Sequence, residues 1–591
     1  MNNGQKACSS SFSKGFNYPA PYQGENMKKI FAAVLGLALF GAVSGHAENY
    51  TLQGRMGSVI RYELQEQITA GEGIKKLTLS FVVPPSYDSP TYKQEIRDFD
   101  LKFTPGPQER KTHTDSRGNQ IIVATWTAPP AVIDVRLACS ALNETRLEKL
   151  ETSAPFPLVK VDPAMADYLK ATEQVQVNDP RIQELAARLT QGVKTQFDAV
   201  QRIISWGVDH VQYVTPPKQY DAIYSFESGK GNCQNYSHLS AALLRAAGIP
   251  VRIVNGVTLN RPFDIALNGG VLTFKMGQGR HSWIEVWFPD LDWVPFDPQN
   301  TVLFVSNRFI RVEIGVDNNE TKNDGLLRWL QAPTAKARPT LQEVINANFQ
   351  EDKVEIRGDR QAYGPKNLLL SPEVLAEFKQ IAIKPPPPPP PLITEEQKKE
   401  LVYDIPFIFG NLQYPEDIDF AFPRTTTAAG KDQFEMERSF LVETAEYVTT
   451  KMTQYAQVVV LNKPVKLQKI GLALHNFGGD GQLWVELLND QNGKPGNPVG
   501  VSDLVDLERL SLRPGYRWET FDFGRESLTL MPGRYWIALG FTGSPIVNWF
   551  YTYGKPVGPI DGTRYKGVFE QDWSGALSYE FNYRVTGLTT K

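Results

Sequence analysis

Hydrophobic and polar positions alternate over much of the early and late parts of the chain, which is the pattern of half-buried β-strands. Lys76–Val83 shows this alternation with β-branched residues, and turns rich in Pro and Gly interrupt the region around it. We therefore predict an N-terminal β-sandwich over residues 48–160. Short strand-like runs such as Ala456–Leu461 predict a second sandwich or jelly roll over residues 401–591.

Between these two regions the apolar period changes from two residues to between three and four. A helix is expected to begin at Asp179-Pro180, and Phe197–Val208 continues in helical period before strands return. This mixture predicts an α+β domain over residues 165–335. Residues 336–400 carry a weaker pattern and include the seven prolines Pro385–Pro391, which favour an extended, stiff spacer. We interpret 336–400 as a linker.

Residues 1–47 have the pattern of a leader followed by a secretory signal peptide. From Met27 two lysines precede an apolar run at Ile30–Val43, and small residues end at Ala47. The apolar run is shorter than the ~20 residues that a spanning helix needs. We expect translation to start at Met27, cleavage after Ala47, and export to the periplasm, the cell surface or the medium; an uncleaved anchor is the alternative.

Charge and cysteine content narrow the class of protein. The net charge is −3 over 591 residues, which gives no reason to expect nucleic acid as a partner. Cys8 precedes the signal, so only Cys139 and Cys233 remain in the exported chain, too few for a disulfide-built scaffold. Cys139 lies in a strand-like run and is interpreted as a core residue. Cys233 has the surroundings of a reactive thiol.

Cys233 is expected in the first turn of a helix. Asn232 is a favourable N-cap, apolar residues recur behind it at helical spacing, and Gly248 and Pro250 provide the end. Free backbone N–H groups at a helix start favour thiolate and can stabilise an oxyanion. Glycines on both sides of Lys230 suggest that the thiol is exposed. The alternative is a small core residue at a helix start.

A thiol nucleophile needs a base, and five histidines follow Ala47: His113, His210, His238, His281 and His475. His281 opens an alternating strand, and turn residues after Phe288 allow a hairpin whose second strand ends at Asp297. A hairpin centred on Pro289 would place His281 opposite Asp297, close enough for a hydrogen bond. The sequence thus predicts a triad of Cys233, His281 and Asp297, with a surface histidine on a hairpin as the alternative.

These segments resemble the transglutaminase-like (papain-like thiol) superfamily. The resemblance rests on Gly231-Asn-Cys233, Leu244–Arg252, His281–Val286 and Trp293–Pro298 in this order, within residues 165–315. It implies a multidomain chain whose α+β transglutaminase-like catalytic domain is flanked by the two β-sandwich regions. It also implies that Cys233, His281 and Asp297 are nucleophile, base and orienting group. Trp206 and Tyr213 are the candidates for an oxyanion-hole side chain.

The resemblance implies acyl transfer on peptide or carboxamide bonds. The calcium sites of animal family members have no clear match in this sequence and no cluster has metal-ligand spacing, so we expect no cofactor or metal. We expect hydrolysis as a peptidase or amidase; protein crosslinking and a non-catalytic surface scaffold are the alternatives. The expected partner is a peptide or protein substrate. The C-terminal region has aromatic residues that could stack on a cell-envelope carbohydrate, although burial in a core is the favoured interpretation. These residues are Trp536, Trp549, Tyr551, Tyr553 and Trp573.

Overall fold

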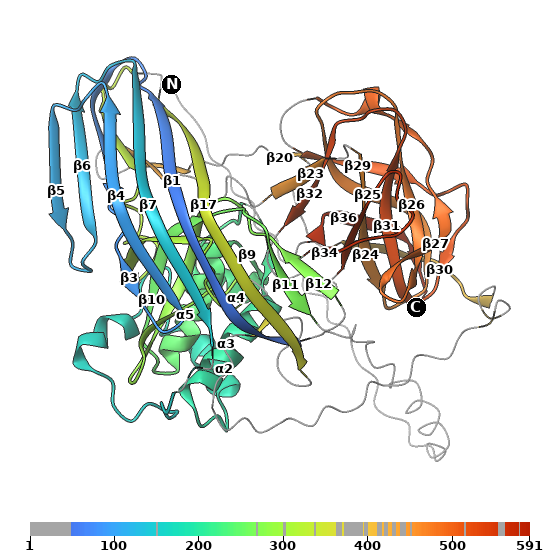
Figure 1. The fold of residues 1–591 in the computed structure, drawn as a ribbon, viewed down its shortest axis with the longest axis horizontal. Helices are drawn as coiled ribbons and strands as arrows, with labels where there is room; N and C mark the ends of the chain where they lie inside the picture. The colour runs from blue at the N-terminus through green and yellow to red at the C-terminus, as the bar shows by residue number, and fades with distance from the viewer. Residues whose placement is uncertain are drawn as a thin grey trace, which may run out of the picture. The chain divides into compact units, whose positions relative to one another are not determined.

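The chain is largely β, and a group of α-helices falls in one stretch of the sequence, residues 180–246 (Figure 1). This computed structural model describes residues 49–590 except 149, 151, 215, 268–269, 300–302, 336–337, 362–368, 371–393, 395–396, 398–399, 411–416, 419–423, 428–432, 438–444, 450–451, 513–515, 553–561 and 578–579. The expected leader and signal peptide, and Pro385–Pro391, lie outside the described residues. Among the described helices none is both long and apolar enough to span a bilayer.

Two sheets built mainly from N-terminal strands enclose one apolar core. The 9-stranded sheet consists of β3 (Tyr87–Asp88), β4 (Tyr92–Thr104), β7 (Val132–Leu147), β1 (Asn49–Thr69), β17 (Thr340–Gln361), β11 (Phe263–Leu267), β12 (Gly270–Phe274) and β34 (Ala576–Leu577) in that order, with β18 (Leu369–Leu370) on β1. The 6-stranded sheet has the order β21 (Arg424–Thr427), β22 (Gln433–Glu437), β16 (Leu326–Gln331), β2 (Ile74–Val82), β6 (Gln120–Thr127) and β5 (Glu109–Thr114). Cys139 on β7 belongs to this core, as predicted.

The first part of the segment interpreted as a linker is a strand. Thr340–Gln361 forms β17, which pairs antiparallel with β1 along its whole length, from Thr69↔Thr340 to Asn49↔Gln361. Figure 1 shows the two strands side by side. The side chains of β17 alternate between half-buried and exposed over much of the strand, and its sequence is more polar than that of a core strand. Backbone pairing with a strand far away in the sequence, rather than apolar content, keeps it in the sheet.

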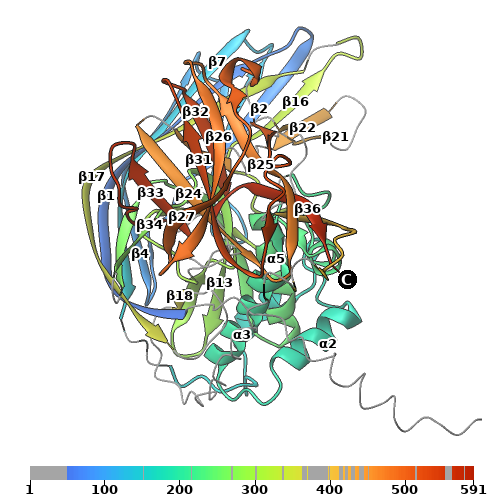
Figure 2. The ribbon, with the colours of Figure 1, turned by 90° about the vertical axis from the view of Figure 1, so that its right-hand side faces the viewer.

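The α+β segment consists of helices on one face of a small sheet. Its helices are η1 (Pro163–Leu169), α2 (Pro180–Leu189), α3 (Gln196–His210), α4 (Ala222–Ser228) and α5 (Cys233–Ala246). The 4-stranded sheet has the order β14 (Asp292–Phe296), β13 (Gly279–Phe288), β10 (Val251–Thr258) and β15 (Phe309–Gly315), and β8 (Gln212–Tyr213) pairs with β9 (Lys230–Gly231). Figures 1 and 2 show α2, α3 and α5 gathered together. Asp179 caps α2, as its sequence predicts.

Both faces of this small sheet are covered. Ile253 and Ile284 pack among apolar side chains of α2, α3 and α5. Val254 and Trp283 face the opposite way and pack with Leu52 and other residues of the N-terminal 9-stranded sheet. Every residue of β10 and β15 is therefore buried. A strand buried on both faces is held rigidly, which suits an element that must fix the position of a reacting group.

The C-terminal region contains two more sheets. One has the order β19 (Ile405–Gly410), β36 (Tyr583–Thr589), β25 (Val465–Asn476), β29 (Tyr516–Asp522) and β20 (Asp417–Ile418), extended by β23 (Ala445–Thr449), β30 (Thr529–Leu530), β32 (Val547–Thr552) and β35 (Glu580–Phe581). The other has the order β27 (Lys494–Val501), β26 (Gln482–Gln491), β31 (Gly533–Phe541), β24 (Thr453–Leu461) and β33 (Thr563–Gly567), with β28 (Val505–Asp506) on β26 and η2 (Leu507–Arg509) following β28. Residues of both sheets form one core.

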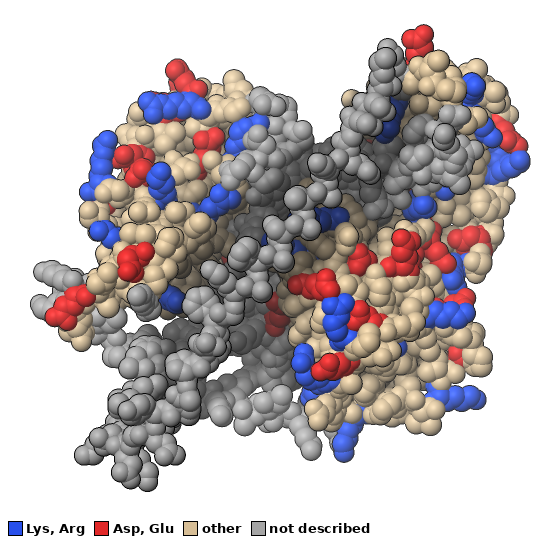
Figure 3. Space-filling model, turned by 180° about the vertical axis from the view of Figure 1, so that it is seen from behind, with Lys and Arg blue, Asp and Glu red and all other residues tan. Residues whose placement is uncertain are grey.

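The aromatic residues of this region lie mostly inside it. Trp536, Trp549 and Tyr551 are at most 1% exposed, and Trp573 is 8% exposed. Tyr553 lies outside the described residues. The favoured interpretation as core residues is therefore confirmed for these four rings. On the molecular surface, Figure 3 shows basic and acidic side chains interspersed over the face in view, without a large area of one sign.

Candidate active site

Cys233 is the first residue of α5, as its sequence predicts. The Asn232 side chain accepts a hydrogen bond from the Gln234 backbone N–H at 3.1 Å, and the Asn235 side chain accepts one from the Asn232 N–H at 3.0 Å. This reciprocal capping fixes the start of the helix. Gly231 is required just before it, because a Cβ at that position would lie 2.3 Å from the Asn235 Cβ.

The thiol is buried, contrary to the expectation from the glycines around Lys230. Cys233 is 1% exposed, and its neighbours Asn232 and Gln234 are at most 2% exposed. The glycines serve local geometry instead. Gly229 ends α4 in the left-handed conformation, and Lys230 and Gly231 form β9 beside β8. In this structure neighbouring residues therefore cover the Cys233 side chain.

His281 lies between Cys233 and Asp297. The His281 Nε2 and the Asp297 Oδ2 are 3.0 Å apart, and both side chains are fully buried. The Cys233 thiol lies near enough to the same imidazole to raise its pKa. Since Nε2 faces Asp297, Nδ1 is the nitrogen available to the thiol. The second Asp297 oxygen accepts a hydrogen bond from the Gln299 backbone N–H at 3.1 Å, which fixes the carboxylate.

The hairpin register differs from the predicted one. β13 and β14 pair as Ile284↔Phe296 and Phe288↔Asp292, so the hairpin is centred on Asp290 rather than Pro289. Continued along the strand, this register places residue 299 opposite His281, and Asp297 is a diagonal neighbour. When the centre of the hairpin shifts by one residue, the residue opposite His281 changes by two positions. Residues two positions apart lie on the same face of a strand, so the Asp297 carboxylate still reaches the imidazole.

The surroundings of His281 favour the imidazolium form. Burial acts to lower its pKa, but the charge and hydrogen bond of Asp297, followed by the hydrogen bond and charge of Cys233, raise the pKa to about 10. Trp283 stacks on the ring with centroids 5.9 Å apart, and Phe309 meets it edge-on at 5.6 Å. The arrangement therefore favours a protonated imidazole that packs against two aromatic rings.

The other histidines have partners elsewhere. His238 bonds through Nδ1 to the Tyr220 carbonyl at 2.6 Å, and burial lowers its pKa to about 4. His210 stacks on Trp206 with ring centroids 4.4 Å apart. His113 lies on exposed β5 and His475 on β25. These contacts of His238 and His210 do not include Cys233.

The two candidates for an oxyanion-hole side chain differ in position. Trp206 lies on α3, where it packs on His210 and Phe226. Tyr213 lies on β8 directly opposite Gly231, two residues before Cys233, and is 5% exposed. Tyr213 is thus the candidate that the fold brings close to the start of α5, whereas the contacts of Trp206 are those of a packing residue.

A buried charge cluster lies next to His281 and is not evident from the sequence. Arg280 pairs with Asp324 and, at 3.3 Å, with Glu343; its side chain is 6% exposed. Glu66 lies opposite Glu343 on β1, and burial followed by the Glu343 charge raises the pKa of Glu66 well above its usual range. The partners of Arg280 are 44 and 63 residues away, so no local pattern marks them.

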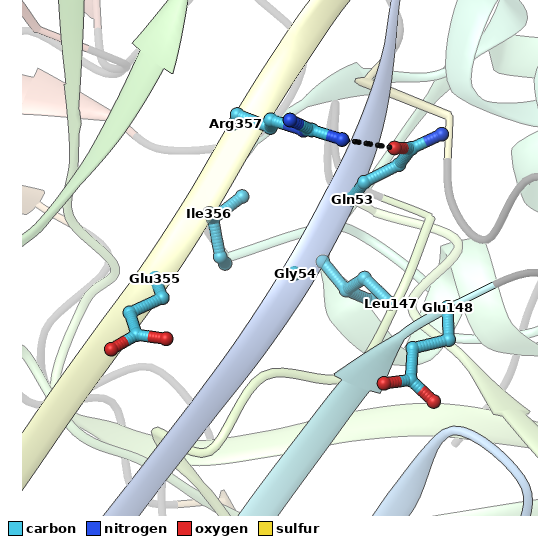
Figure 4. A pocket seen from close by; sticks show the side chains of 7 residues that line it. All are labelled: Gln53, Gly54, Leu147, Glu148, Glu355, Ile356 and Arg357. Carbon is cyan, nitrogen blue, oxygen red and sulfur yellow. Dashed lines mark hydrogen bonds between the residues drawn. The ribbon is translucent and has the colours of Figure 1, made fainter.

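One surface hollow of about 600 Å³ lies apart from these residues, across β1, β7 and β17 (Figure 4). Arg357 donates to the Gln53 side chain at 3.2 Å on its rim. Its lining residues are Gln53, Gly54, Leu147, Glu148, Glu355, Ile356 and Arg357. Because it includes neither a candidate triad residue nor a sequence neighbour of one, the hollow is not part of the candidate active site.

Parts of this chain resemble known proteins. The model of the transglutaminase-like superfamily matches residues 183–298. The uncharacterized protein YebA of Bacillus subtilis is 34% identical over 151 residues, which are 24% of this chain and 20% of YebA. A protein-glutamine gamma-glutamyltransferase of Pseudomonas aeruginosa is 33% identical over 75 residues, 13% of this chain and 11% of that protein. The chain thus spans about a fifth or less of these two relatives.

Among solved structures, the periplasmic domain of TgpA from Pseudomonas aeruginosa is 18% identical, with a TM-score of 0.22 over 40% of this chain and 89% of that one. This score is too low to assign a fold, so the assignment rests on the sequence match. The match includes Cys233, His281 and Asp297 and nearly all of the helices and strands that position them. Residues 183–298 of this chain therefore form a domain of the transglutaminase-like superfamily.

Proposed function

We propose that the protein is a cysteine-dependent acyl-transfer enzyme acting on peptide or carboxamide bonds. Cys233 is the nucleophile, His281 the acid and base, and Asp297 the group that orients His281. The observation that carries the proposal is the buried His281, which contacts Asp297 through Nε2 and whose pKa is raised by Asp297 and by the nearby Cys233. The family match supports this type of chemistry, and the acceptor of the acyl group decides the outcome of the proposed reaction.

In the first step the Cys233 sulfur attacks the substrate carbonyl carbon. A C–S bond forms, and the carbonyl oxygen becomes an oxyanion for which the N–H groups of the first turn of α5 are the proposed donors. His281 gives its proton to the leaving nitrogen as the C–N bond breaks. Ammonia or an amine departs, and an acyl group remains on the sulfur.

In the second step an acceptor takes the acyl group. His281, now neutral, removes a proton from water as the water oxygen forms a C–O bond with the acyl carbon. The C–S bond then breaks, which releases the product as a carboxylate and frees the Cys233 sulfur. We propose this hydrolysis as the main outcome, as in a peptidase or amidase. A lysine amine in place of water would give a crosslink, an alternative favoured by the partial match to a protein-glutamine gamma-glutamyltransferase.

We further infer that the enzyme is exported and that the sheets on either side of its catalytic domain are β-sandwich modules. The N-terminal pattern of residues 27–47 supports export. The two-sheet cores support the sandwich assignment. A peptide or protein is the proposed substrate. Binding of a cell-envelope carbohydrate by the C-terminal region stays a prediction.

Incubating the full chain with a glutamine-containing peptide library in H₂¹⁸O, with and without a biotinylated alkylamine, tests the proposal. We expect an acyl adduct on Cys233 by mass spectrometry, and ¹⁸O in the released carboxylate. Biotin incorporation at the expense of ¹⁸O would show that transamidation is the reaction. Cys233→Ala is the control, and equal product formation by this variant would exclude Cys233 as the nucleophile.

A further inference from the structure

A buried polar network joins the helix that carries Cys233 to the strand that carries His281. The Ser237 hydroxyl on α5 donates to the Ser282 carbonyl on β13 at 3.1 Å, and both residues are fully buried. Ser237 is one helical turn after Cys233, and Ser282 directly follows His281. The relative position of the two reacting side chains therefore depends on contacts made by their neighbours.

Asn318 is the centre of this network. It lies between β15 and β16 and is 5% exposed. Its Oδ1 accepts a hydrogen bond from the Ser282 hydroxyl at 3.2 Å, and its Nδ2 donates to the Asn255 Oδ1 at 3.0 Å and to the Thr321 hydroxyl at 2.9 Å. Both amide protons are thus used, so the side-chain orientation of Asn318 is fully determined.

Asn318 also contacts the Cys233 helix directly. Its backbone N–H donates to the His238 Nε2 at 3.2 Å, while the His238 Nδ1 donates to the Tyr220 carbonyl. These two bonds require neutral His238 with its proton on Nδ1. Since burial favours the neutral imidazole, His238 serves as an uncharged connector between α5 and Asn318.

We propose that Asn318 is a positioning residue that sets the geometry of Cys233 and His281. It bonds to α5 through its backbone and to β13 through its amide, and Asn255 and Thr321 hold it in place. A displacement of about 1 Å between reacting groups can cost about 10²-fold in rate. The proposal rests on the proposed thiol chemistry, because a positioned pair matters only if Cys233 is the nucleophile.

The test uses the full chain and the variant Asn318→Ala, which removes three side-chain hydrogen bonds and keeps the backbone bond to His238. Two readouts are the rate of Cys233 alkylation by iodoacetamide and the pKa of His281 from NMR titration. We expect alkylation at neutral pH to slow at least about tenfold. The pKa of His281 should fall, because contact with Cys233 is one of the causes that raise it.

Asn476→Ala is the matched control. Asn476 is 4% exposed, lies on β25 and donates to two backbone carbonyls, those of Leu507 and Leu510, at 3.2 Å. The substitution Asn476→Ala removes a buried side-chain amide comparable to that of Asn318. Asn476 is far from Cys233 in the sequence and lies in a different sheet. The proposal is supported if Asn476→Ala lowers stability without an effect on His281, whereas Asn318→Ala has both effects.

Ser282→Ala is a second, milder variant that can be used if Asn318→Ala does not fold. It removes only the hydrogen bond from the Ser282 hydroxyl to Asn318. The two substitutions combined should slow alkylation no more than Asn318→Ala alone. Additive effects, or a normal His281 pKa and rate in Asn318→Ala, would overturn the proposal. Wild-type Cys233 alkylated no faster than an unfolded cysteine would instead overturn the proposed function.

Discussion

At the residue scale, the two cysteines should differ in reactivity although both are buried. Burial raises the pKa of Cys139 to about 12, so its thiol stays protonated at neutral pH. Cys233 contacts an imidazole that is protonated below about pH 10. We expect iodoacetamide to modify Cys233 and to leave Cys139 unmodified in the folded chain, as shown by peptide mass spectrometry. Equal labelling of both thiols would contradict an activated Cys233.

Asp297→Asn should preserve the fold and impair the chemistry. The amide keeps the shape of the carboxylate but removes its charge, the main influence that raises the pKa of His281. We expect the pKa of His281 to fall in NMR titration and acyl transfer to slow about 10²–10⁴-fold. His281→Ala should be at least as slow. Full rates in both variants would mean that the triad does not act.

The sequence predicts a role for a residue where neighbouring residues in the sequence indicate its structural setting. Asn232 before a helical apolar pattern predicts Cys233 at a helix start. His281 opens an alternating strand, and the predicted hairpin after it returns to the carboxylate of Asp297. Burial of Cys233 had no local signal, since it depends on packing around the whole site. Asn318 had none either, because an asparagine between two strands resembles an ordinary turn residue.

At the scale of elements, the pairing of Glu66 on β1 with Glu343 on β17 predicts a dependence of stability on pH. Burial raises the pKa of Glu66 in the folded chain above its unfolded value, so its contribution to stability is present in acid and is lost as the pH rises. Glu66→Gln should mimic the protonated form. We expect this variant to exceed the wild type in free energy of unfolding at pH 8, with a smaller difference at pH 5.

Urea denaturation at the two pH values measures this effect. Glu63→Gln is a suitable control, because Glu63 lies on the same strand, and its pKa is lowered, mainly by a hydrogen bond from Arg136. The control should lose stability at pH 8, the opposite sign. An identical response of both variants would contradict a protonated Glu66 in the folded chain.

The elements themselves were largely predictable where hydrophobic period and capping residues agree. Asp179-Pro180 begins α2, and the predicted C-terminal run Ala456–Leu461 lies within β24. The hairpin after Phe288 was predicted with a centre one residue too early. Three residues separate β13 from β14, and Asp292 adopts a positive φ of 59° that no pattern in the turn sequence required.

At the scale of the molecule, β17 connects the part of the chain after the catalytic domain to its N-terminal sheet. Its polar sequence suggested a linker, since pairing with a strand that begins nearly three hundred residues earlier leaves no local trace. β17 also supplies the partners of two buried cations. Arg308, fully buried, is held by Asp352 at 2.6 and 2.9 Å, and Arg280 is held by Glu343.

Two truncations separate the contribution of β17 from that of the C-terminal region. A chain that ends at Gln380 keeps β17, Cys233, His281 and Asp297, and we expect it to fold and to retain alkylation of Cys233. A chain that ends at Pro339 loses β17, which leaves one edge of β1 unpaired. Arg308 then loses Asp352, and Arg280 loses Glu343 but keeps Asp324. Leaving one buried charge unpaired costs about 3–5 kcal/mol, a large share of the stability of a typical domain.

We therefore expect the shorter chain to show no cooperative thermal unfolding and the longer chain to show one. Circular dichroism over a temperature ramp, with alkylation followed in parallel, makes the comparison. Asp352→Asn in the longer chain separates the effect of the charge from that of the strand, because β17 stays and only the ion pair with Arg308 is weakened. The melting temperature of this variant should fall, but its unfolding should remain cooperative. Cooperative unfolding of the chain that ends at Pro339 would show that β17 is dispensable and that the catalytic domain is complete without it.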